Sequence, residues 1–287
     1  MRASDANCPA GVEVAYPNAL DRGCRLALVT LEAVGKTFQG RTGSWEAVRD
    51  FTLDLAEGQF TCLLGTSGCG KTTVLNLLAG FEAPTAGRIL LDGVPVQGPS
   101  AERGVVFQGH DSLYDWLSAL DNIGFGLRLR GVPKRERRAR AGHFLTMVGL
   151  EGQGAKHPAE LSGGMKQRIQ IARALAADPR ILLMDEPFGA LDAMTRATLQ
   201  SELTRIWAET RKTVLFITHD IEEAVALSTQ VAVMTRGPGG TLKAVIPVDL
   251  PFPRDRTSDG FMAVFRQVHA LIHAEIVAPQ ARAEIHQ

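Results

Sequence analysis

A short apolar run leads directly into a glycine-rich loop near residue 65, and this combination constrains the fold more than any other feature of the chain. Residues 59–65 read QFTCLLG, which is typical of a short strand buried on both faces. Residues 65–72 read GTSGCGKT and fit the pattern G-x-x-x-x-G-K-S/T at every position. The next residues, VLNLL at 74–78, place apolar side chains at helical spacing. A strand, a phosphate-binding loop and a helix in this order predict an α/β fold.

The loop has the groups that bind the phosphates of a nucleoside triphosphate. Its glycines let backbone N–H groups turn inward around phosphate oxygens, and the start of the next helix adds partial positive charge. We expect Lys71 to reach the β- and γ-phosphates of a bound nucleotide and Thr72 to bind Mg²⁺. An alkylating reagent on Cys69 is expected to block the nucleotide. The nucleotide-binding residues predicted from the loop are Gly65, Thr66, Ser67, Gly68, Cys69, Gly70, Lys71, Thr72 and Thr73.

Three further apolar runs indicate the rest of the core. They read RILLMDEP (180–187), TVLFITHD (213–220) and QVAVMTRG (230–237), and helical patterns lie between residues 186 and 230. Strands that alternate with helices predict a parallel sheet with helices on its faces. This half of the chain is therefore expected to be the nucleotide-binding core.

The remaining segments predict the domain organisation. Apolar runs at 26–34, 51–59 and 87–93 indicate strands of an antiparallel β-layer beside the core. The residues at about 98–175 are mostly helical in pattern and indicate an inserted helical subdomain. We expect a flexible tail over 1–25, a nucleotide-binding P-loop domain over 26–245 that contains this subdomain, and a C-terminal extension over 246–287 with an amphipathic helix.

Polar residues stand where apolar runs end. Asp185 and Glu186 end one run, His219 ends another, and Gln108 follows RGVVF. Ligands of open α/β sheets bind at the carboxyl ends of strands. There, Asp185 and Gln108 suit a Mg²⁺ site, Glu186 suits orienting a water, and His219 suits a γ-phosphate contact. Each residue alone has a structural alternative: solvated acids, a structural histidine and a surface-loop glutamine.

Charge and composition limit the classes of molecule that the chain is expected to bind. Lys and Arg total 31, as do Asp and Glu, so the formal net charge is zero, which disfavours a general nucleic-acid-binding protein. The four cysteines form no CxxC pair, so a reducing cytosolic compartment is expected. No apolar run approaches the roughly 18 residues that cross a bilayer, so a membrane function would need other subunits. The basic block at 128–140 is interpreted as a solvated helix face, with a contact to lipid head groups or an acidic partner as the alternative.

A second glycine turn, LSGGMKQR at 161–168, lacks the lysine of the first. With the other motifs it resembles the ATP-binding cassette (ABC) family of transport ATPases, over residues 26 to about 245. The matching motifs occur in the order GTSGCGKT (Walker A), Gln108 (Q-loop), LSGGMKQR (signature), ILLMDEP (Walker B), GALD at 189–192 (D-loop) and His219 (switch histidine). Met165 stands where the signature most often has glutamine.

The resemblance implies a head-to-tail dimer of two copies with two ATP molecules at the interface. Ser162, Gly163 and Gly164 of one copy would contact the γ-phosphate that Lys71 of the other copy binds. Asp192 would couple the two sites. Lys71, Glu186 and His219 would be the catalytic residues. Phe38 best matches the aromatic residue that stacks on adenine in this family, with Trp45 as its competitor.

A closer resemblance is to the nitrate/sulfonate/taurine importer ATPases. It rests on GPSAERGVVFQ (98–108), MDEPFGALDAMTR (184–196), THDIEEAVAL (218–227) and TRGPGG (235–240). It implies ATP-driven uptake of taurine or a related sulfonate or nitrate-type solute, at the cytoplasmic face of the inner membrane. The implied partners are an integral membrane permease and, indirectly, a solute-binding protein, and no nucleic acid.

One departure and one alternative accompany this resemblance. Asp115 stands where relatives have a proline before the tryptophan (Trp116 here), in the region that receives the permease. The alternative is a non-transport ABC ATPase that acts on DNA or ribosomes. Such proteins usually carry long coiled-coil insertions or two cassettes in one chain, and neither is present in this sequence.

Overall fold

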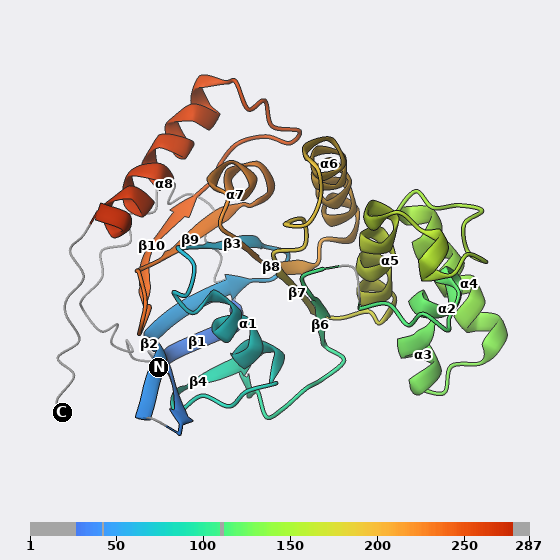
Figure 1. Ribbon diagram of the computed structural model, residues 1–287, viewed down its shortest axis with the longest axis horizontal. Helices are drawn as coiled ribbons and strands as arrows, with labels where there is room; N and C mark the ends of the chain where they lie inside the picture. The colour runs from blue at the N-terminus through green and yellow to red at the C-terminus, as the bar shows by residue number, and fades with distance from the viewer. Residues whose placement is uncertain (1–26, 42, 110–111, 278–287) are drawn as a thin grey trace, which may run out of the picture.

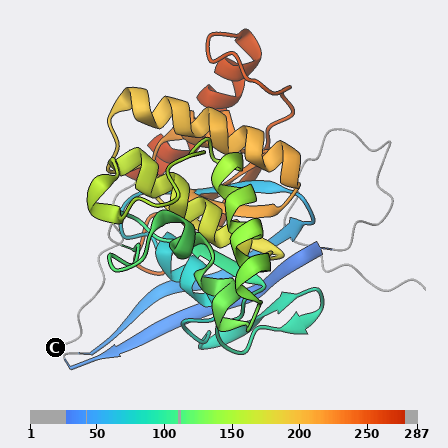
Figure 2. The same ribbon diagram turned by 90° about the vertical axis from the view of Figure 1, so that its right-hand side faces the viewer.

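The structure is a computed structural model that describes residues 27–41, 43–109 and 112–277 (Figure 1). The tail predicted over residues 1–25 lies outside the described residues. Two sheets lie close together in the centre of the molecule, and a group of helices between residues 119 and 176 forms its own body beside them. Figure 2, turned by 90°, shows this helical group in front of the sheets.

The larger sheet has the strand order β10-β9-β3-β8-β7-β6. Its neighbouring strands are parallel, except that β10 is antiparallel to β9. The strand before the glycine loop, β3, lies inside the sheet and is buried at every residue, which confirms the prediction from its continuous apolar run. The bounds are β3 Phe60–Leu64, β6 Arg103–Val106, β7 Ile181–Asp185, β8 Thr213–Thr218, β9 Gln230–Met234 and β10 Leu242–Pro247.

The register of this sheet brings three functional segments to one edge. Leu64 of β3 lies opposite Thr218 of β8, and Asp185 of β7 lies opposite Ile217 of β8. The glycine loop, Glu186 and His219 therefore leave the sheet from neighbouring strand ends. This is the carboxyl edge, where ligands bind in sheets of this kind.

The smaller sheet has the order β2-β1-β4-β5 and is antiparallel throughout. In β2, Phe51, Leu53 and Leu55 are buried, whereas Thr52 and Asp54 are exposed. This period of two is expected for a strand with one buried face, and the predicted antiparallel layer is confirmed. The bounds are β1 Ala27–Gly40, β2 Gly43–Ala56, β4 Ala86–Leu91 and β5 Val94–Pro95.

Two apolar cores hold these layers together. Helix α1 (Lys71–Ala79) packs Val74, Leu75 and Leu78 in one core with side chains of both sheets. The other core covers the opposite face of the larger sheet and includes residues of α5 (Gly163–Ala176), α6 (Ala193–Thr210) and α7 (Ile221–Leu227). The glycine loop is thus placed between two well-packed layers.

The helical subdomain begins later than the sequence pattern predicts. The expected start was about residue 98, but residues 103–106 form β6, an edge strand of the larger sheet that pairs with β7. The short run GVV offers enough apolar side chains for an edge position. Helices then run from residue 119 to residue 176, with α5 in contact with β6 and α6. Their bounds before α5 are α2 Ala119–Ile123, α3 Phe125–Leu129, α4 Lys134–Met147 and the 3₁₀ turn η1 Pro158–Glu160.

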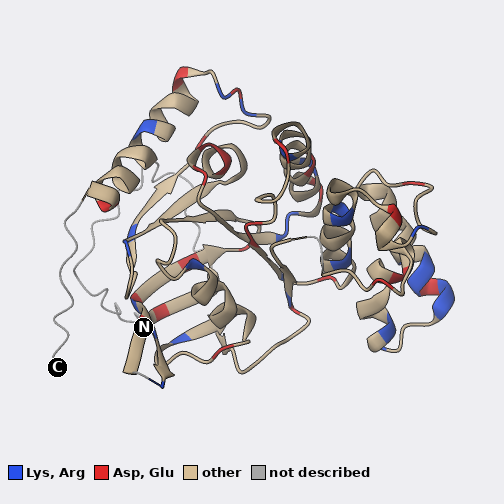
Figure 3. Cartoon of the chain, in the orientation of Figure 1, with Lys and Arg blue, Asp and Glu red and all other residues tan. Residues whose placement is uncertain are grey.

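The basic block at 128–140 covers the end of α3 and the first half of α4, where Lys and Arg cluster in Figure 3. All its cations except Arg137 are exposed. Arg140 pairs with Glu136 one turn away, and Arg130 donates to the backbone carbonyl of Ala177. The block therefore lies on the surface, and the choice between a solvated helix face and a contact to lipid head groups or an acidic partner stays a prediction.

The last described helix, α8 (Asp259–Val277), lies along the outer side of α7 and β9. Phe261 and Val268 are buried, and Phe265 and Ile272 pack partly buried against the same core. These positions recur at helical spacing, so one stripe of the helix faces the protein. Across the described ranges, no helix has the length and apolar character needed to span a membrane.

Candidate active site

The glycine loop joins β3 to α1 in a backbone conformation that only glycine adopts without strain at two positions. Gly68 and Gly70 have φ values of 77° and 103°, in the left-handed region that L side chains rarely occupy. A Cβ atom on Gly70 would lie 2.6 Å from the carbonyl oxygen of Ala47. These two glycines are therefore required by the turn itself.

Lys71 begins α1 and is buried, with 7% of its surface exposed. Its ammonium group donates hydrogen bonds to the carbonyl oxygens of Gly65 (2.8 Å) and Thr66 (3.0 Å). The cation therefore lies inside the curve of the loop. It is held by carbonyls that a phosphate oxygen can replace as the acceptor.

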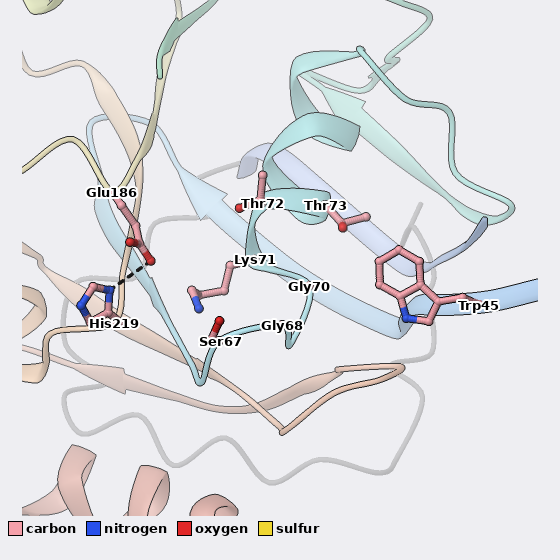
Figure 4. Close-up of a pocket in the computed structure, with 9 residues that line it drawn as sticks. All are labelled: Trp45, Ser67, Gly68, Gly70, Lys71, Thr72, Thr73, Glu186 and His219. Atoms are coloured by element: carbon pink, nitrogen blue, oxygen red, sulfur yellow. Dashed lines mark ion pairs between the residues drawn. The ribbon is translucent and has the colours of Figure 1, made fainter. Parts of the chain in front are cut away.

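A cavity of about 450 Å³ opens above Lys71 (Figure 4). Its size is in the range of small-molecule sites. The cavity is surrounded by residues of the glycine loop and α1, by residues that follow β7 and β8, and by one residue of β2. The lining residues are Trp45, Ser67, Gly68, Gly70, Lys71, Thr72, Thr73, Glu186 and His219.

The two carboxylates that follow β7 have different surroundings. Burial raises the pKa of Asp185, although a hydrogen bond from the Thr72 hydroxyl and the charge of Lys71 oppose this shift. Glu186 has a positive φ of 41°, and its N–H donates to the carbonyl of Ile217 at 3.1 Å. This turn directs the Glu186 side chain across to the next strand end, where its Oε1 lies 3.1 Å from Nδ1 of His219.

Gln108 follows β6 and is exposed. It does not line the cavity, but its Nε2 lies 3.7 Å from the position of a Cβ on Gly189, and Oε2 of Glu186 lies 3.9 Å from the same point. The amide of Gln108 and the carboxylate of Glu186 therefore flank the same glycine. The structure brings Gln108 to the border of the site.

The aromatic residues beside the cavity come from the β1–β2 hairpin. Phe38 and Trp45 lie opposite each other in the strand register, and their rings stack with centroids 5.3 Å apart. Trp45 lines the cavity with 52% of its surface exposed, whereas Phe38 lies behind it and has the Lys36 ammonium 4.9 Å from its ring. Of the two rings, that of Trp45 is therefore the one that lines the cavity.

Cys69 corrects one expectation. From the sequence, the side chain is interpreted as a small filler inside the loop, which its exposed fraction of 0% supports, but the expected block of the nucleotide by an alkylating reagent requires a thiol that the reagent can reach. Burial also raises the pKa of the thiol, which reduces the reactive thiolate. The thiol is a packing group beneath the loop.

The second glycine turn does not join this cavity. Ser162 caps α5, with its Oγ accepting the N–H of Met165 at 3.3 Å, and Gly163 and Gly164 form the first turn of that helix. A separate hollow of about 300 Å³ lies there. Asp192 caps the neighbouring helix α6 through the N–H of Thr195 at 3.0 Å. Within one chain, the signature turn and the D-loop thus adjoin each other away from Lys71.

Comparison with known proteins settles the family. The family model described as ABC transporter matches residues 48–189. A taurine import ATP-binding protein of Chromobacterium violaceum is 50% identical over 240 residues, which are 83% of this chain and 90% of that protein. A nitrate import ATP-binding protein of Synechococcus elongatus is 48% identical over 227 residues, 78% of this chain and 82% of that protein.

The chain belongs to the ABC transporter family. Its fold agrees with that of a solved ATP-binding cassette, which was determined as a dimer in a post-hydrolysis state bound to ADP and phosphate. The two share 32% sequence identity with a TM-score of 0.66, and the match covers 78% of this chain and all of that cassette. The predicted P-loop ABC fold is thereby confirmed.

The cassette also contains a support for its phosphate loop that the sequence did not reveal. Residues 237–240, after β9, pack directly on the loop: a Cβ on Gly237 would lie 2.5 Å from the carbonyl oxygen of Gly68, and one on Gly240 would lie 2.1 Å from that of Cys69. Gly240 also forms a bridge with Val48 of β2. The GPGG run was the available signal, but nothing in it indicates what it packs against.

Proposed function

We propose that this chain is the ATP-hydrolysing subunit of an ABC importer. The observation that carries the proposal is the contact of Glu186 with His219 at 3.1 Å, at the mouth of the cavity that contains Lys71. A phosphate-binding cation, a carboxylate and an imidazole in one cavity match what phosphoryl transfer to water requires. The relatives named as taurine and nitrate import ATP-binding proteins support the same function.

Each side chain of the site has a separate role in hydrolysis. Lys71 binds the β- and γ-phosphates and neutralises part of their charge. Glu186 accepts a hydrogen bond from the attacking water and orients it toward the γ-phosphorus. His219 holds the Glu186 carboxylate in place and stabilises the charge that develops on the γ-phosphate oxygens. The attacking water then adds to phosphorus as the bond to the β-phosphate oxygen breaks, which gives ADP and phosphate.

The donors for Mg²⁺ fit this scheme. Thr72 lines the cavity, and its hydroxyl lies close enough to the Asp185 carboxylate to oppose the rise of the pKa of Asp185. Oxygen donors of this kind suit a hard cation. Gln108 can contribute an amide oxygen from the border of the site. When bound, Mg²⁺ neutralises charge on the phosphate oxygens.

The adenine contact is assigned to Trp45. Its ring is exposed on the cavity wall, and Phe38 supports it from behind at 5.3 Å. A flat, exposed aromatic face is what a purine stacks on. We therefore propose Trp45 as the stacking residue and Phe38 as its support.

The active form is proposed to be a head-to-tail dimer of this chain. Ser162, Gly163 and Gly164 stand at a helix start, which suits a phosphate, but lie apart from Lys71 within one copy. A second copy can bring its turn to the γ-phosphate, with Asp192 beside it. The dimeric form of the related cassette supports this arrangement.

The permease is proposed to dock on aromatic residues near Gln108. Phe81 and Phe107 stack at 6.0 Å and are 47% and 44% exposed, and Trp116 is 73% exposed. The exposed, stacked pair Phe81 and Phe107 forms an apolar patch of the kind that marks interaction surfaces, and Trp116 adds an exposed aromatic residue further along the chain. Docking here would place the chain at the cytoplasmic face of the inner membrane. The solute is proposed to be taurine or a related sulfonate or nitrate-type anion, delivered to the permease by a solute-binding protein.

Hydrolysis of ATP by the purified chain tests the enzymatic part. We expect phosphate release with Mg²⁺, none after chelation by EDTA, and a rate for Lys71→Ala near background. A Lys71→Ala variant that hydrolyses ATP at the wild-type rate would contradict the assignment.

Growth tests the transport part. A strain without this protein is expected to lose growth on one of taurine, an alkanesulfonate or nitrate as the sole source of sulfur or nitrogen. The wild-type chain should restore that growth, and Lys71→Ala should not. Unchanged growth on all three compounds would contradict the proposed solute class.

A further inference from the structure

The position of His219 depends on its backbone. Its side chain is 65% exposed, and the polar partner that the described chain gives its ring is Glu186. An exposed ring with a single contact can rotate away unless the residues on either side fix its Cα–Cβ direction. The structure that sets this direction is the short connection between β8 and α7.

That connection is held by a modified helix cap. Asp220 caps α7, with its Oδ1 accepting the N–H of Glu223 at 3.1 Å. In an ordinary capping box, the carboxylate of the third helical residue would in turn accept the N–H of the cap residue. Here the hydroxyl of Thr218 stands between them: it accepts the N–H of Asp220 at 3.0 Å and donates to the Glu223 carboxylate. These hydrogen bonds link Thr218, Asp220 and Glu223, and so hold the backbone on both sides of His219.

Glu223 is anchored from a second element. Its other carboxylate oxygen accepts a hydrogen bond from Nε2 of Gln200 in α6 at 2.9 Å. Glu223 and Gln200 are buried, with 7% and 4% of their surfaces exposed. Arg256, from the segment before α8, donates to the free oxygen of Gln200.

A carboxylate in this place is not the arrangement that stability alone favours. Burying a charged group costs free energy unless it is well paired, and burial accordingly raises the pKa of Glu223. Well-packed apolar residues of similar volume often serve stability equally well. What the carboxylate adds is two directed hydrogen bonds, one to the loop of His219 and one to α6.

We propose that Glu223 is a positioning residue for hydrolysis: it fixes the Thr218–Asp220 connection so that His219 meets Glu186, and Gln200 fixes Glu223 in turn. The inference rests on the proposed function, because it assigns a purpose to the placement of His219. Since α6 begins directly after Asp192, the same bond ties the His219 loop to the helix that carries the D-loop.

Steady-state ATP hydrolysis by the full-length chain tests this role through kcat and KM separately. Glu223→Ala removes both hydrogen bonds, and Thr218→Val removes the hydroxyl while keeping the shape of the side chain. A misplacement of about 1 Å can reduce a rate roughly 100-fold, so we expect kcat to fall about 10- to 100-fold in both variants. KM for ATP should change less than about threefold, since nucleotide binding depends on Lys71 and Trp45.

Two further variants separate positioning from general loss of stability. Glu223→Gln keeps an oxygen for Gln200 and a polar group for Thr218, and is expected to retain kcat within about fivefold of wild type. Gln230→Met breaks another buried hydrogen bond of the same sheet, from Gln230 to Thr61 at 2.9 Å, at the end of β3 away from the site. It should lower the midpoint of thermal unfolding without a matching loss of kcat.

The outcomes distinguish this proposal from the proposed function. If wild type hydrolyses ATP but Thr218→Val and Glu223→Ala keep the kcat of Gln230→Met, the positioning role is wrong and the enzymatic function stands. A parallel rise of KM with the loss of kcat would also overturn it, since that indicates a damaged nucleotide site. If Glu223→Ala does not fold, the comparison of kcat between Thr218→Val and Glu223→Gln still decides: the positioning role requires a lower kcat in Thr218→Val. A wild-type chain without activity would instead overturn the proposed function.

Discussion

Adding a single methyl group at Gly240 is expected to weaken ATP binding by displacing the phosphate loop from behind. A Cβ atom there would lie 2.1 Å from the carbonyl oxygen of Cys69, whereas real contacts of this kind are not shorter than 3.0 Å. The backbone must therefore move by roughly 1 Å. Gly240 cannot easily retreat, because its carbonyl accepts the N–H of Arg49 at 3.2 Å and it forms a bridge with Val48. We therefore expect the phosphate loop to take up the displacement.

Overpacking of this kind costs about 1–3 kcal/mol. If the nucleotide site bears the strain, Kd for ATP rises roughly 5- to 140-fold. Kd should be measured by calorimetry for Gly240→Ala and for Gly142→Ala. Gly142 lies in α4 with nothing within 4 Å of an added Cβ, so alanine there should leave Kd unchanged and stabilise the helix by about 1 kcal/mol.

Two results would refute this reasoning. An unchanged Kd with an unchanged unfolding midpoint would mean that the methyl group is accommodated freely. An unchanged Kd with a lowered midpoint would mean that residues 237–240 move and that the phosphate loop does not depend on them.

Three other predictions concern the site. Glu186→Gln is expected to lower kcat about 100- to 10,000-fold with ATP binding retained and an ATP-dependent dimer in size-exclusion chromatography; near-normal hydrolysis would contradict the role of Glu186. Trp45→Ala should weaken the free energy of ATP binding by about 1–3 kcal/mol because the stacking contact is lost, and Phe38→Ala should weaken it less. A larger effect of Phe38→Ala would reverse the assignment. In a Cys8→Ser, Cys24→Ser background, a maleimide should label the chain only after unfolding, because Cys62 and Cys69 are both buried; rapid labelling of the native chain would contradict that burial.

The sequence predicts those parts of the site that local chemistry determines. The β3 strand, the glycine loop and α1 follow from one contiguous stretch. The apolar run fits only a buried strand, the glycines fit the turn around phosphate, and Lys71 marks the start of the helix. Asp185, Glu186 and His219 are predictable as strand-end residues, since parallel strands share one carboxyl edge. Their order in the sheet then brings Glu186 and His219 together.

The parts that were missed depend on packing between distant segments. That Trp45, and not Phe38, lines the cavity depends on how the β1–β2 hairpin meets the loop, which no local pattern states; the residue that stacks on adenine stays a prediction. The support from Gly240 joins it to Cys69, about 170 positions away in the chain. The Thr218 relay between Asp220 and Glu223 replaces the usual capping contact and is visible only in the hydrogen bonds.

The central claim is that each ATP site is completed by a second copy of the chain, and mixing two inactive variants tests it most directly. Lys71→Ala disables the phosphate loop, and Ser162→Arg blocks the signature turn. A mixed dimer would combine the intact loop of one copy with the intact turn of the other. We expect a one-to-one mixture to recover roughly a quarter of the wild-type rate, since half of the dimers are mixed and each has one intact site. No recovery, in a mixture where differently tagged copies are shown to pair, would contradict the account.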